Sequence, residues 1–269
     1  MPQQHVNGIN IYYESHGAGR PLVLIAGLGY GLWMWHKMIP GLAEHFRVVV
    51  FDNRGAGRSD KPDGPYSVQM LAADTAGLID ALEIEQAAVM GHSMGGFIAQ
   101  ELVLTRPELV GRLILSATNF GGPRHVPVTP EALAVMMDRS GDPVDVVKRG
   151  IAVACAPGFA DAHPEVVEEL VAYRLSNPVP PAQYQAQMAV GLGLMSEEAA
   201  FEHRLKDVRA PTLILFGEHD RVVPPANADL LAREIADSAI VVLPGAGHIF
   251  PIETPDAAVA AVVEFLNRR

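Results

Sequence analysis

Residues 87–99 read Ala-Ala-Val-Met-Gly-His-Ser-Met-Gly-Gly-Phe-Ile-Ala, and this stretch decides the fold class. Its first four residues form a short apolar run, typical of a parallel strand that is buried on both faces. A helical pattern begins at Gly95, so Ser93 lies where a strand turns sharply into a helix. Glycine suits positions 91 and 95, because side chains there would meet the crossing backbone. The pattern predicts a positive φ at Ser93 and a hydroxyl presented above the sheet edge.

Similar short apolar runs occur on both sides of this stretch, at residues 22–25, 48–51, 113–115, 213–216 and 240–243. Helical patterns separate them, including residues 68–82 after a capping Ser67 and residues 255–266 after a capping Thr254. Asn7-Gly8 predicts a type I′ hairpin turn near the N-terminus. Repeated alternation of strand and helix predicts an α/β fold with a mostly parallel, doubly wound sheet.

The alternation stops between residues 120 and 206, where prolines separate helical stretches at 131–138, 144–153 and 164–175. We therefore expect residues 1–119 and 207–269 to form the α/β core and residues 120–206 to form a helical cap. A cap of this kind would cover the sheet edge where ligands bind. An ordinary helical subdomain without a gating role has the same sequence pattern, and the two interpretations stay open.

Composition excludes several classes of function. The formal charge of −11 and the absence of Lys or Arg clusters argue against nucleic-acid binding. No apolar run reaches the roughly 18 residues of a membrane span, and the first residues lack a signal-peptide pattern, so we expect a cytoplasmic protein without a membrane partner. Cys155 is the only cysteine and is expected to be a packed side chain. The histidines lack metal-ligand spacing, so neither a metal nor a cofactor is expected, and the oligomeric state stays open.

Two further polar residues follow late strands, as a nucleophilic serine requires. A serine hydroxyl needs a base to take its proton, and the base needs an acid to hold its tautomer. Gly217-Glu218-His219-Asp220 follows the run at 213–216, and Gly245-Ala246-Gly247-His248 follows the run at 240–243. These positions predict a triad of Ser93, His248 and a carboxylate, with Glu218 as the alternative to Asp220.

Four motifs together resemble the α/β-hydrolase family over essentially the whole chain. The first is the nucleophile elbow Gly-His-Ser-Met-Gly-Gly at 91–96, the sharp strand-to-helix turn at Ser93 described above. The others are the sequence Asp-Asn-Arg-Gly-Ala-Gly-Arg-Ser at 52–59, the Gly-x-x-Asp loop at 217–220 and the Gly-His turn at 247–248. Pro157-Gly158-Phe159 also resembles the cap of 3-oxoadipate enol-lactonases. The resemblance implies that Asp220 is the acid, and it leaves His92 as a structural neighbour of the elbow.

The resemblance also implies an oxyanion hole formed by the backbone N–H groups of Leu28 and Met94. Relatives carry His-Gly where this chain has Ala26-Gly27. Backbone donors need no particular side chain, so Ala26 is expected to be tolerated. Whether the missing histidine loosens the loop stays open. Removing an oxyanion donor typically costs 10²–10³-fold in rate, so the position of this loop matters.

Residues expected to line the substrate pocket are Gly27, Trp33, Phe120, Met136 and Ile249, together with Leu28 and Met94. A wider set of candidates is apolar or aromatic and includes Tyr30, Trp35, Met137, Met188 and Phe250.

The expected function is that of a serine carboxylesterase, which cleaves small carboxylic esters through an acyl-enzyme and needs no cofactor. A lactone hydrolase resembling 3-oxoadipate enol-lactonase is the first alternative. Its carboxylate-bearing substrate would require a cation in the cap, for which Arg124, Arg139 and Arg174 are candidates. Carbon–carbon bond hydrolysis, perhydrolysis and a slow-turnover ligand receptor use the same triad and stay open.

Overall fold

The computed structural model describes residues 2–268 and contains one eight-stranded sheet of order β1-β2-β4-β3-β5-β6-β7-β8. The strands are β1 (Gln3–Val6), β2 (Ile9–His16), β3 (Pro21–Ile25), β4 (Arg47–Phe51), β5 (Ala87–His92), β6 (Val110–Ser116), β7 (Thr212–Gly217) and β8 (Ser238–Leu243). β1 and β2 pair antiparallel, as do β2 and β4, and every other neighbouring pair is parallel. The predicted mostly parallel sheet is confirmed.

The N-terminal hairpin turns at the predicted dipeptide. Asn7 and Gly8 have φ values of 48° and 77°, which a type I′ turn requires at both central positions. β1 and β2 pair directly on either side of this turn, with Val6 opposite Ile9. The hairpin prediction is therefore confirmed.

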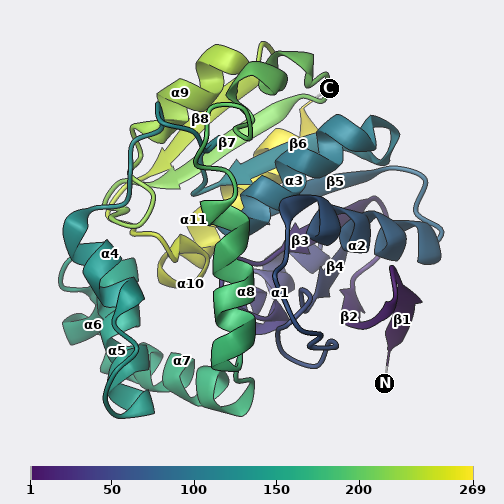
Figure 1. The fold of residues 1–269 in the computed structure, drawn as a ribbon. Coiled ribbons are helices and arrows are strands. Elements are labelled where there is room, and N and C mark those ends of the chain that lie inside the picture. The colour runs from purple at the N-terminus through teal and green to yellow at the C-terminus, as the bar shows by residue number, and fades with distance from the viewer. Residues whose placement is uncertain (1, 269) are drawn as a thin grey trace.

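Helices cover both faces of the sheet (Figure 1). α2 (Val68–Ala81), α3 (Met94–Thr105) and α9 (Asn227–Glu234) bury one face, while α1 (Ile39–Ala43), the 3₁₀ helix η1 (Leu32–Trp35), α10 (Phe250–Glu253) and α11 (Pro255–Asn267) bury the other. Ser67 caps α2 as predicted, accepting from the N–H of Met70 at 3.2 Å. Thr254 does not cap α11, because its hydroxyl points back to the carbonyl of Phe250 instead.

Between β6 and β7 the chain forms five helices and, among these residues, no strand. They are α4 (Pro130–Met137), α5 (Pro143–Ala154), α6 (Phe159–Ala162), α7 (Pro164–Ser176) and α8 (Pro181–Leu192), followed by the 3₁₀ helix η3 (Glu202–Asp207). We call residues 120–206 the insertion. Its two ends meet, because the N–H of Phe201 donates to the carbonyl of Phe120 at 2.8 Å and both rings are buried in the core.

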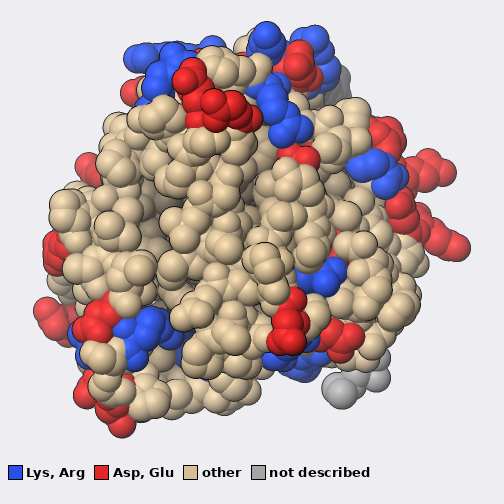
Figure 2. All heavy atoms as spheres, in the orientation of Figure 1, with Lys and Arg blue, Asp and Glu red and all other residues tan. Residues whose placement is uncertain are grey.

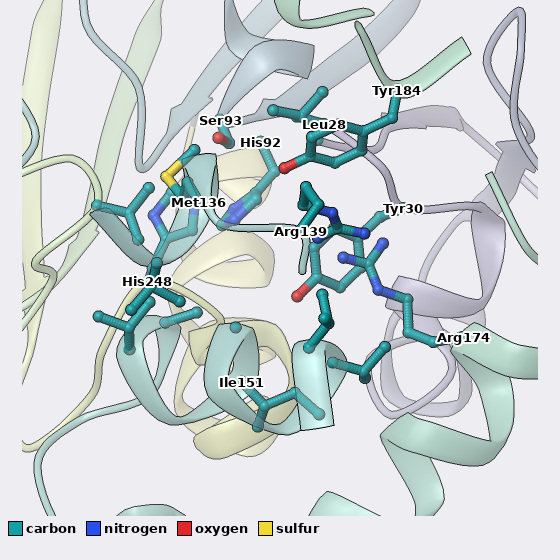
Figure 3. A pocket seen from close by; sticks show the side chains of 18 residues that line it. Leu28, Tyr30, His92, Ser93, Met136, Arg139, Ile151, Arg174, Tyr184 and His248 are labelled. Atoms are coloured by element: carbon teal, nitrogen blue, oxygen red, sulfur yellow. The ribbon is translucent and has the colours of Figure 1, made fainter. Parts of the chain in front are cut away.

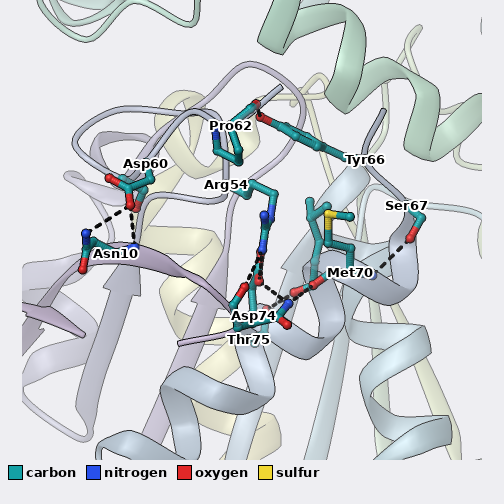
Figure 4. A network of polar contacts seen from close by, with 12 residues as sticks. Asn10, Arg54, Asp60, Pro62, Tyr66, Ser67, Met70, Asp74 and Thr75 are labelled. Carbon is teal, nitrogen blue, oxygen red and sulfur yellow. Dashed lines mark hydrogen bonds and ion pairs between the residues drawn. The ribbon is translucent and has the colours of Figure 1, made fainter. Parts of the chain in front are cut away.

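A buried ion pair fixes the loop after β4 (Figure 4). Arg54 Nη2 lies 2.6 Å from Asp74 Oδ1, and Arg54 Nε donates to Asp74 Oδ2 at 2.8 Å. The side chain of Asn7 donates to the same carboxylate at 2.7 Å. Both charges are buried and paired by two hydrogen bonds, so removing one partner would leave a costly buried charge. The pair therefore holds residues 53 and 54 rigidly beside the sheet edge.

No helix among residues 2–268 has the length and apolar character needed to cross a membrane.

Candidate active site

Ser93 lies in a strained turn between β5 and α3. Its φ of 55° and ψ of −119° are unusual for a residue with a side chain, and the predicted positive φ is confirmed. A Cβ at Gly91 would collide with the carbonyl of Gly95, and a Cβ at Gly95 would collide with the carbonyl of Ile25. The two glycines thus permit the close backbone contacts that hold Ser93 in this conformation.

Asp220 and His248 lie on the loops that follow β7 and β8. His248 Nδ1 lies 2.7 Å from Asp220 Oδ2, and both side chains are buried. The other carboxylate oxygen of Asp220 accepts from the N–H groups of Val222 and Val223 at 2.9 and 2.8 Å. These bonds fix the orientation of the Asp220 carboxyl group, which in turn orients the imidazole with its Nε2 available for another partner.

The Ser93 hydroxyl and the His248 ring line the same cavity (Figure 3). Within the described chain, Ser93 Oγ and His248 Nε2 are not hydrogen-bonded to each other. Such bonds are often long before substrate binds and shorten in the complex. The elbow and the two loops thus bring a serine, a histidine and an aspartate to one edge of the sheet.

His92 lies beside the catalytic candidates and makes a structural contact. Its Nδ1 lies 2.8 Å from Ser116 Oγ, and its ring centroid lies 4.9 Å from that of His248. Complete burial, with the nearby His248 ring, holds the pKa of His92 well below its ordinary value. His92 is therefore neutral at ordinary pH and supports the His248 ring.

The loop after β3 is held by side chains from two other parts of the chain. Asn53 Nδ2 donates to the carbonyl of Ala26 at 2.9 Å. The N–H of Gly29 donates to Gln187 Oε1 at 2.9 Å, and Gln187 Nε2 donates to the carbonyl of Arg54 at 2.9 Å. Gln187 is fully buried on α8 of the insertion. The loop therefore has hydrogen-bond partners in Asn53 and Gln187, without a histidine at position 26.

The oxyanion candidate Met94 directly follows Ser93 in the sequence, and the other candidate, Leu28, lines both cavities that contain Ser93. Met94 is the first residue of α3, where N–H groups have no partner within the helix. Among the described residues, no acceptor takes the N–H of Leu28.

Sequence reasoning missed Gln187, and a lone buried glutamine in a helical pattern gives no signal that identifies its partner.

A second contact joins the insertion to the histidine turn. The N–H of His248 donates to the carbonyl of Ala154 at 2.7 Å. The carboxylate of Glu253 accepts from the N–H of Ala156 at 2.7 Å and from that of Gly247 at 3.1 Å. Burial raises the pKa of Glu253 to about 7, although both N–H groups and His248 lower it. The end of α5 therefore packs directly on the turn that carries His248.

Two cavities meet at Ser93. Both are lined by Leu28, Ser93, Met136 and Val222. The first, which we call the arginine cavity, also contains His248, Arg139, Arg174 and the rings of Tyr30 and Tyr184. The second, which we call the methionine cavity, is lined mainly by apolar residues, including Phe97, Leu133, Met137, Met188, Leu192 and Met195.

The predicted pocket residues divide between the cavities and the core. Gly27 and Met136 line the cavities as expected, and so do Tyr30, Met137 and Met188. Trp33, Phe120 and Ile249 line neither cavity at Ser93, and Trp35 and Phe250 are fully buried in the core.

The three expected pocket residues that line neither cavity have packing roles instead. Trp33 stacks on Tyr173 of α7, with ring centroids 5.5 Å apart. Phe120 closes the base of the insertion with Phe201, and Ile249 is buried beneath the histidine turn together with Trp33. Large apolar side chains next to a site are as well suited to core packing as to a pocket, and sequence does not separate the two roles.

Among residues 2–268 no cluster of three or more His, Cys, Asp or Glu side chains is arranged to hold a metal ion. Cys155 is buried at the end of α5, and burial raises the pKa of its thiol. The cysteine is therefore a packed side chain, as expected from the sequence.

Comparison with known families agrees with this architecture. The model of the α/β hydrolase fold family matches residues 20–255, which is most of the chain. The chain belongs to the α/β-hydrolase family.

Relatives within the α/β-hydrolase family have different reactions in their names. "Putative carbamate hydrolase RutD" of Azorhizobium caulinodans is 33% identical over 258 residues, which cover 95% of this chain and 94% of that protein. 3-Oxoadipate enol-lactonase 2 of Acinetobacter baylyi is 30% identical, with coverage of 96% and 95%. The structure of Est816, titled an N-acyl homoserine lactone degrading enzyme, is 30% identical with a TM-score of 0.83, covering 98% of this chain and all of that one.

Proposed function

We propose that this protein is a serine hydrolase that cleaves carboxylic esters of small substrates through an acyl-enzyme on Ser93. The observation that carries the proposal is the bond of 2.7 Å between His248 Nδ1 and Asp220 Oδ2, with Ser93 in the same cavity. This arrangement fits a base held in one tautomer beside a nucleophile. Its partner is a small-molecule ester, and no step requires a cofactor.

In the proposed reaction, His248 Nε2 takes the hydroxyl proton as Ser93 Oγ forms a bond to the carbonyl carbon. The carbonyl electron pair moves to oxygen, which accepts from the N–H groups of Leu28 and Met94. When the carbonyl re-forms, the bond to the alcohol oxygen breaks and that oxygen takes the proton from His248. Water then repeats the sequence at the acyl-enzyme, releasing the carboxylic acid and restoring Ser93.

Hydrolysis of p-nitrophenyl esters from acetate to dodecanoate tests this proposal. We expect Ser93→Ala to lower kcat by about 10⁴-fold or more, since the nucleophile is lost. A fluorophosphonate should add its mass to the peptide that contains Ser93 in the wild type and not in the variant. Equal rates in the wild type and in Ser93→Ala would overturn the assignment.

A lactone is the second candidate substrate, because two of the relatives described above have lactone hydrolysis in their names. The chemistry is the same, with the alcohol tethered to the acyl group. Rapid opening of an enol-lactone or a γ-lactone beside slow ester turnover would move the assignment from esterase to lactonase. The Ser93→Ala control applies equally to both substrates.

A further inference from the structure

The arginine cavity holds two cations and is also lined by His248 and Ser93 (Figure 3). Arg174 comes from α7, and Arg139 follows α4. The Arg174 guanidinium carbon lies 4.3 Å from the centre of the Tyr30 ring, and that of Arg139 lies 4.6 Å from the centre of the Tyr184 ring. Each guanidinium therefore rests on an aromatic face and keeps its N–H donors for another partner.

Neither guanidinium has an acidic partner among the described residues. Asp138, next to Arg139, accepts from Ser140 and lies 3.6 Å from Arg149. Glu169, five residues before Arg174, lies 3.0 Å from His36 and 3.2 Å from Lys37. The third candidate from the sequence, Arg124, pairs with Glu202 at 2.9 Å and lines neither cavity. Of the Lys and Arg side chains among residues 2–268, only Arg139 and Arg174 line a cavity at Ser93.

Arg174 also lies against the proposed oxyanion loop. A Cβ placed on Gly29 would lie 3.1 Å from Arg174 Nη1 and 2.9 Å from the ring of Tyr184. Gly29 directly follows Leu28, whose N–H is the proposed oxyanion donor. An anion bound by Arg174 would therefore lie beside the loop that carries the proposed oxyanion donor.

The methionine cavity has the opposite character. It encloses about 230 Å³ and is lined by no Lys, Arg, Asp or Glu side chain. Several of its lining residues are partly exposed, among them Met137 and Leu192, with 61% and 65% of their surface accessible. The face around this opening carries few charged side chains (Figure 2). Flexible methionines on an open apolar cavity suit an alkyl chain of variable length.

The position of His248 assigns the two cavities to the two halves of an ester. His248 must protonate the leaving oxygen, and it lines the arginine cavity but not the methionine cavity. The alcohol half therefore belongs in the arginine cavity, and the acyl half belongs in the methionine cavity. The arginine cavity encloses about 80 Å³ between Ser93 and the two arginines, and the same two arginines also line an adjoining cavity of about 320 Å³. The space between Ser93 and the arginines therefore suits a short alcohol with one carboxylate.

We propose that the substrate is an ester between an apolar acyl chain and a short hydroxycarboxylic acid, whose carboxylate binds between Arg139 and Arg174. This inference rests on the proposed function of Ser93 and adds the chemical class of both halves of its substrate. Bidentate guanidinium–carboxylate bonds supply both the charge and the direction that such recognition requires.

Matched substrates test the proposal. Hexanoyloxyacetate and hexanoyloxyacetamide share the acyl chain and the size of the alcohol half, but only the first carries a charge. We expect kcat/KM for the acid to exceed that for the amide by about tenfold or more. In the double variant Arg139→Gln, Arg174→Gln, the ratio of the two kcat/KM values should fall to within about twofold of one. Arg174→Lys should retain part of the preference, because lysine keeps the positive charge but cannot form the bidentate bonds of a guanidinium group.

Lys148→Gln is the matched control, since Lys148 is an exposed cation of α5 that lines neither cavity. It removes one positive charge from the same insertion and should leave the ratio unchanged. The ester monohexyl succinate places the carboxylate on the acyl half instead, and it should be a poor substrate. Circular dichroism and the Tm of each variant show whether it is folded.

The outcomes separate this inference from the proposed function. If Ser93-dependent hydrolysis of the amide is observed but the acid is not preferred, the inference fails while the function stands. A preference that survives the double arginine variant, or a preference for monohexyl succinate that depends on the arginines, also overturns it. If neither these two esters nor the p-nitrophenyl esters are cleaved in a Ser93-dependent way, the proposed function itself fails. Ser93-dependent cleavage of the p-nitrophenyl esters alone overturns only the inference.

Discussion

The elbow at Ser93 and the loop at Leu28 meet at the same reaction site, and their geometry is fixed in different ways. The elbow is held by contacts of backbone on backbone, which the absent side chains of Gly91 and Gly95 permit. The loop is held by the side chains of Asn53 and Gln187, the second of which lies 158 positions from its partner. Local backbone rules therefore determine the first region, and long-range pairing determines the second.

The largest effect should come from breaking the elbow. Gly95→Ala would place a methyl group against the carbonyl of Ile25, so the turn or the strand must shift. We expect kcat to fall by about 10²–10³-fold, because small displacements of a nucleophile are costly, and the free energy of unfolding to fall by about 1–3 kcal/mol. Ester hydrolysis and urea unfolding measure the two effects.

Gly150→Ala is the matched control for stability. Gly150 lies within α5, and no heavy atom outside its own helix lies within 4 Å of the place its Cβ would occupy. Alanine should therefore raise the free energy of unfolding by about 0.5–1 kcal/mol. Equal stability changes in the two variants would contradict the account of the elbow.

A smaller loss should follow from releasing the loop. Gln187→Ala leaves the buried N–H of Gly29 and the carbonyl of Arg54 without partners. We expect the free energy of unfolding to fall by about 1–3 kcal/mol and kcat to fall by about tenfold, with a smaller change in KM. A positioning role predicts this split, because the loop carries an oxyanion donor.

Gln185→Ala serves as the control on the same helix, since Gln185 is exposed on α8. Steady-state kinetics with a p-nitrophenyl ester measure kcat and KM for both variants. If Gln187→Ala lowers stability and leaves kcat unchanged, the glutamine only packs the helix and does not position the loop.

The smallest effect concerns Glu253, whose carboxylate accepts from the N–H of Gly247 in the core and from that of Ala156 in the insertion. Its folded pKa of about 7 lies above the ordinary value of 4.5, so the folded state binds more protons between these pH values. The free energy of unfolding should therefore fall as pH rises from 4.5 to 7, by about 1 kcal/mol after allowance for partial exposure. Urea unfolding across this range should show the slope in the wild type and lose it in Glu253→Gln. An equal slope in both proteins would contradict the assignment.

The difference between local backbone contacts and long-range side-chain pairing also explains which features could be predicted from the sequence alone. The positive φ of Ser93 and the turn at Asn7-Gly8 depend on neighbours in the chain, and both were predictable from a few residues. The strands were predictable because continuous apolar runs of this length need cover on both faces.

The contents of the pocket were not predictable in the same way. Trp33 and Phe120 were expected to contact substrate and instead join the insertion to the core, because packing and binding select the same side chains. Gln187 carried no local signal, since its two hydrogen bonds reach residues far away in the sequence. Arg139 and Arg174 were candidates among three cations, and only the structure brings these two together near Ser93.

The contact between Phe120 and Phe201 has a consequence for engineering. Because the insertion leaves and re-enters the core at one hydrogen bond, a chimera could exchange residues 120–206 for the corresponding helices of a relative with only two splice points. The transplanted segment would need a glutamine at the position of Gln187 and a backbone N–H group that donates to the Glu253 carboxylate, as that of Ala156 does. Under those two conditions the fold permits new substrate preferences to be grafted onto an unaltered nucleophile.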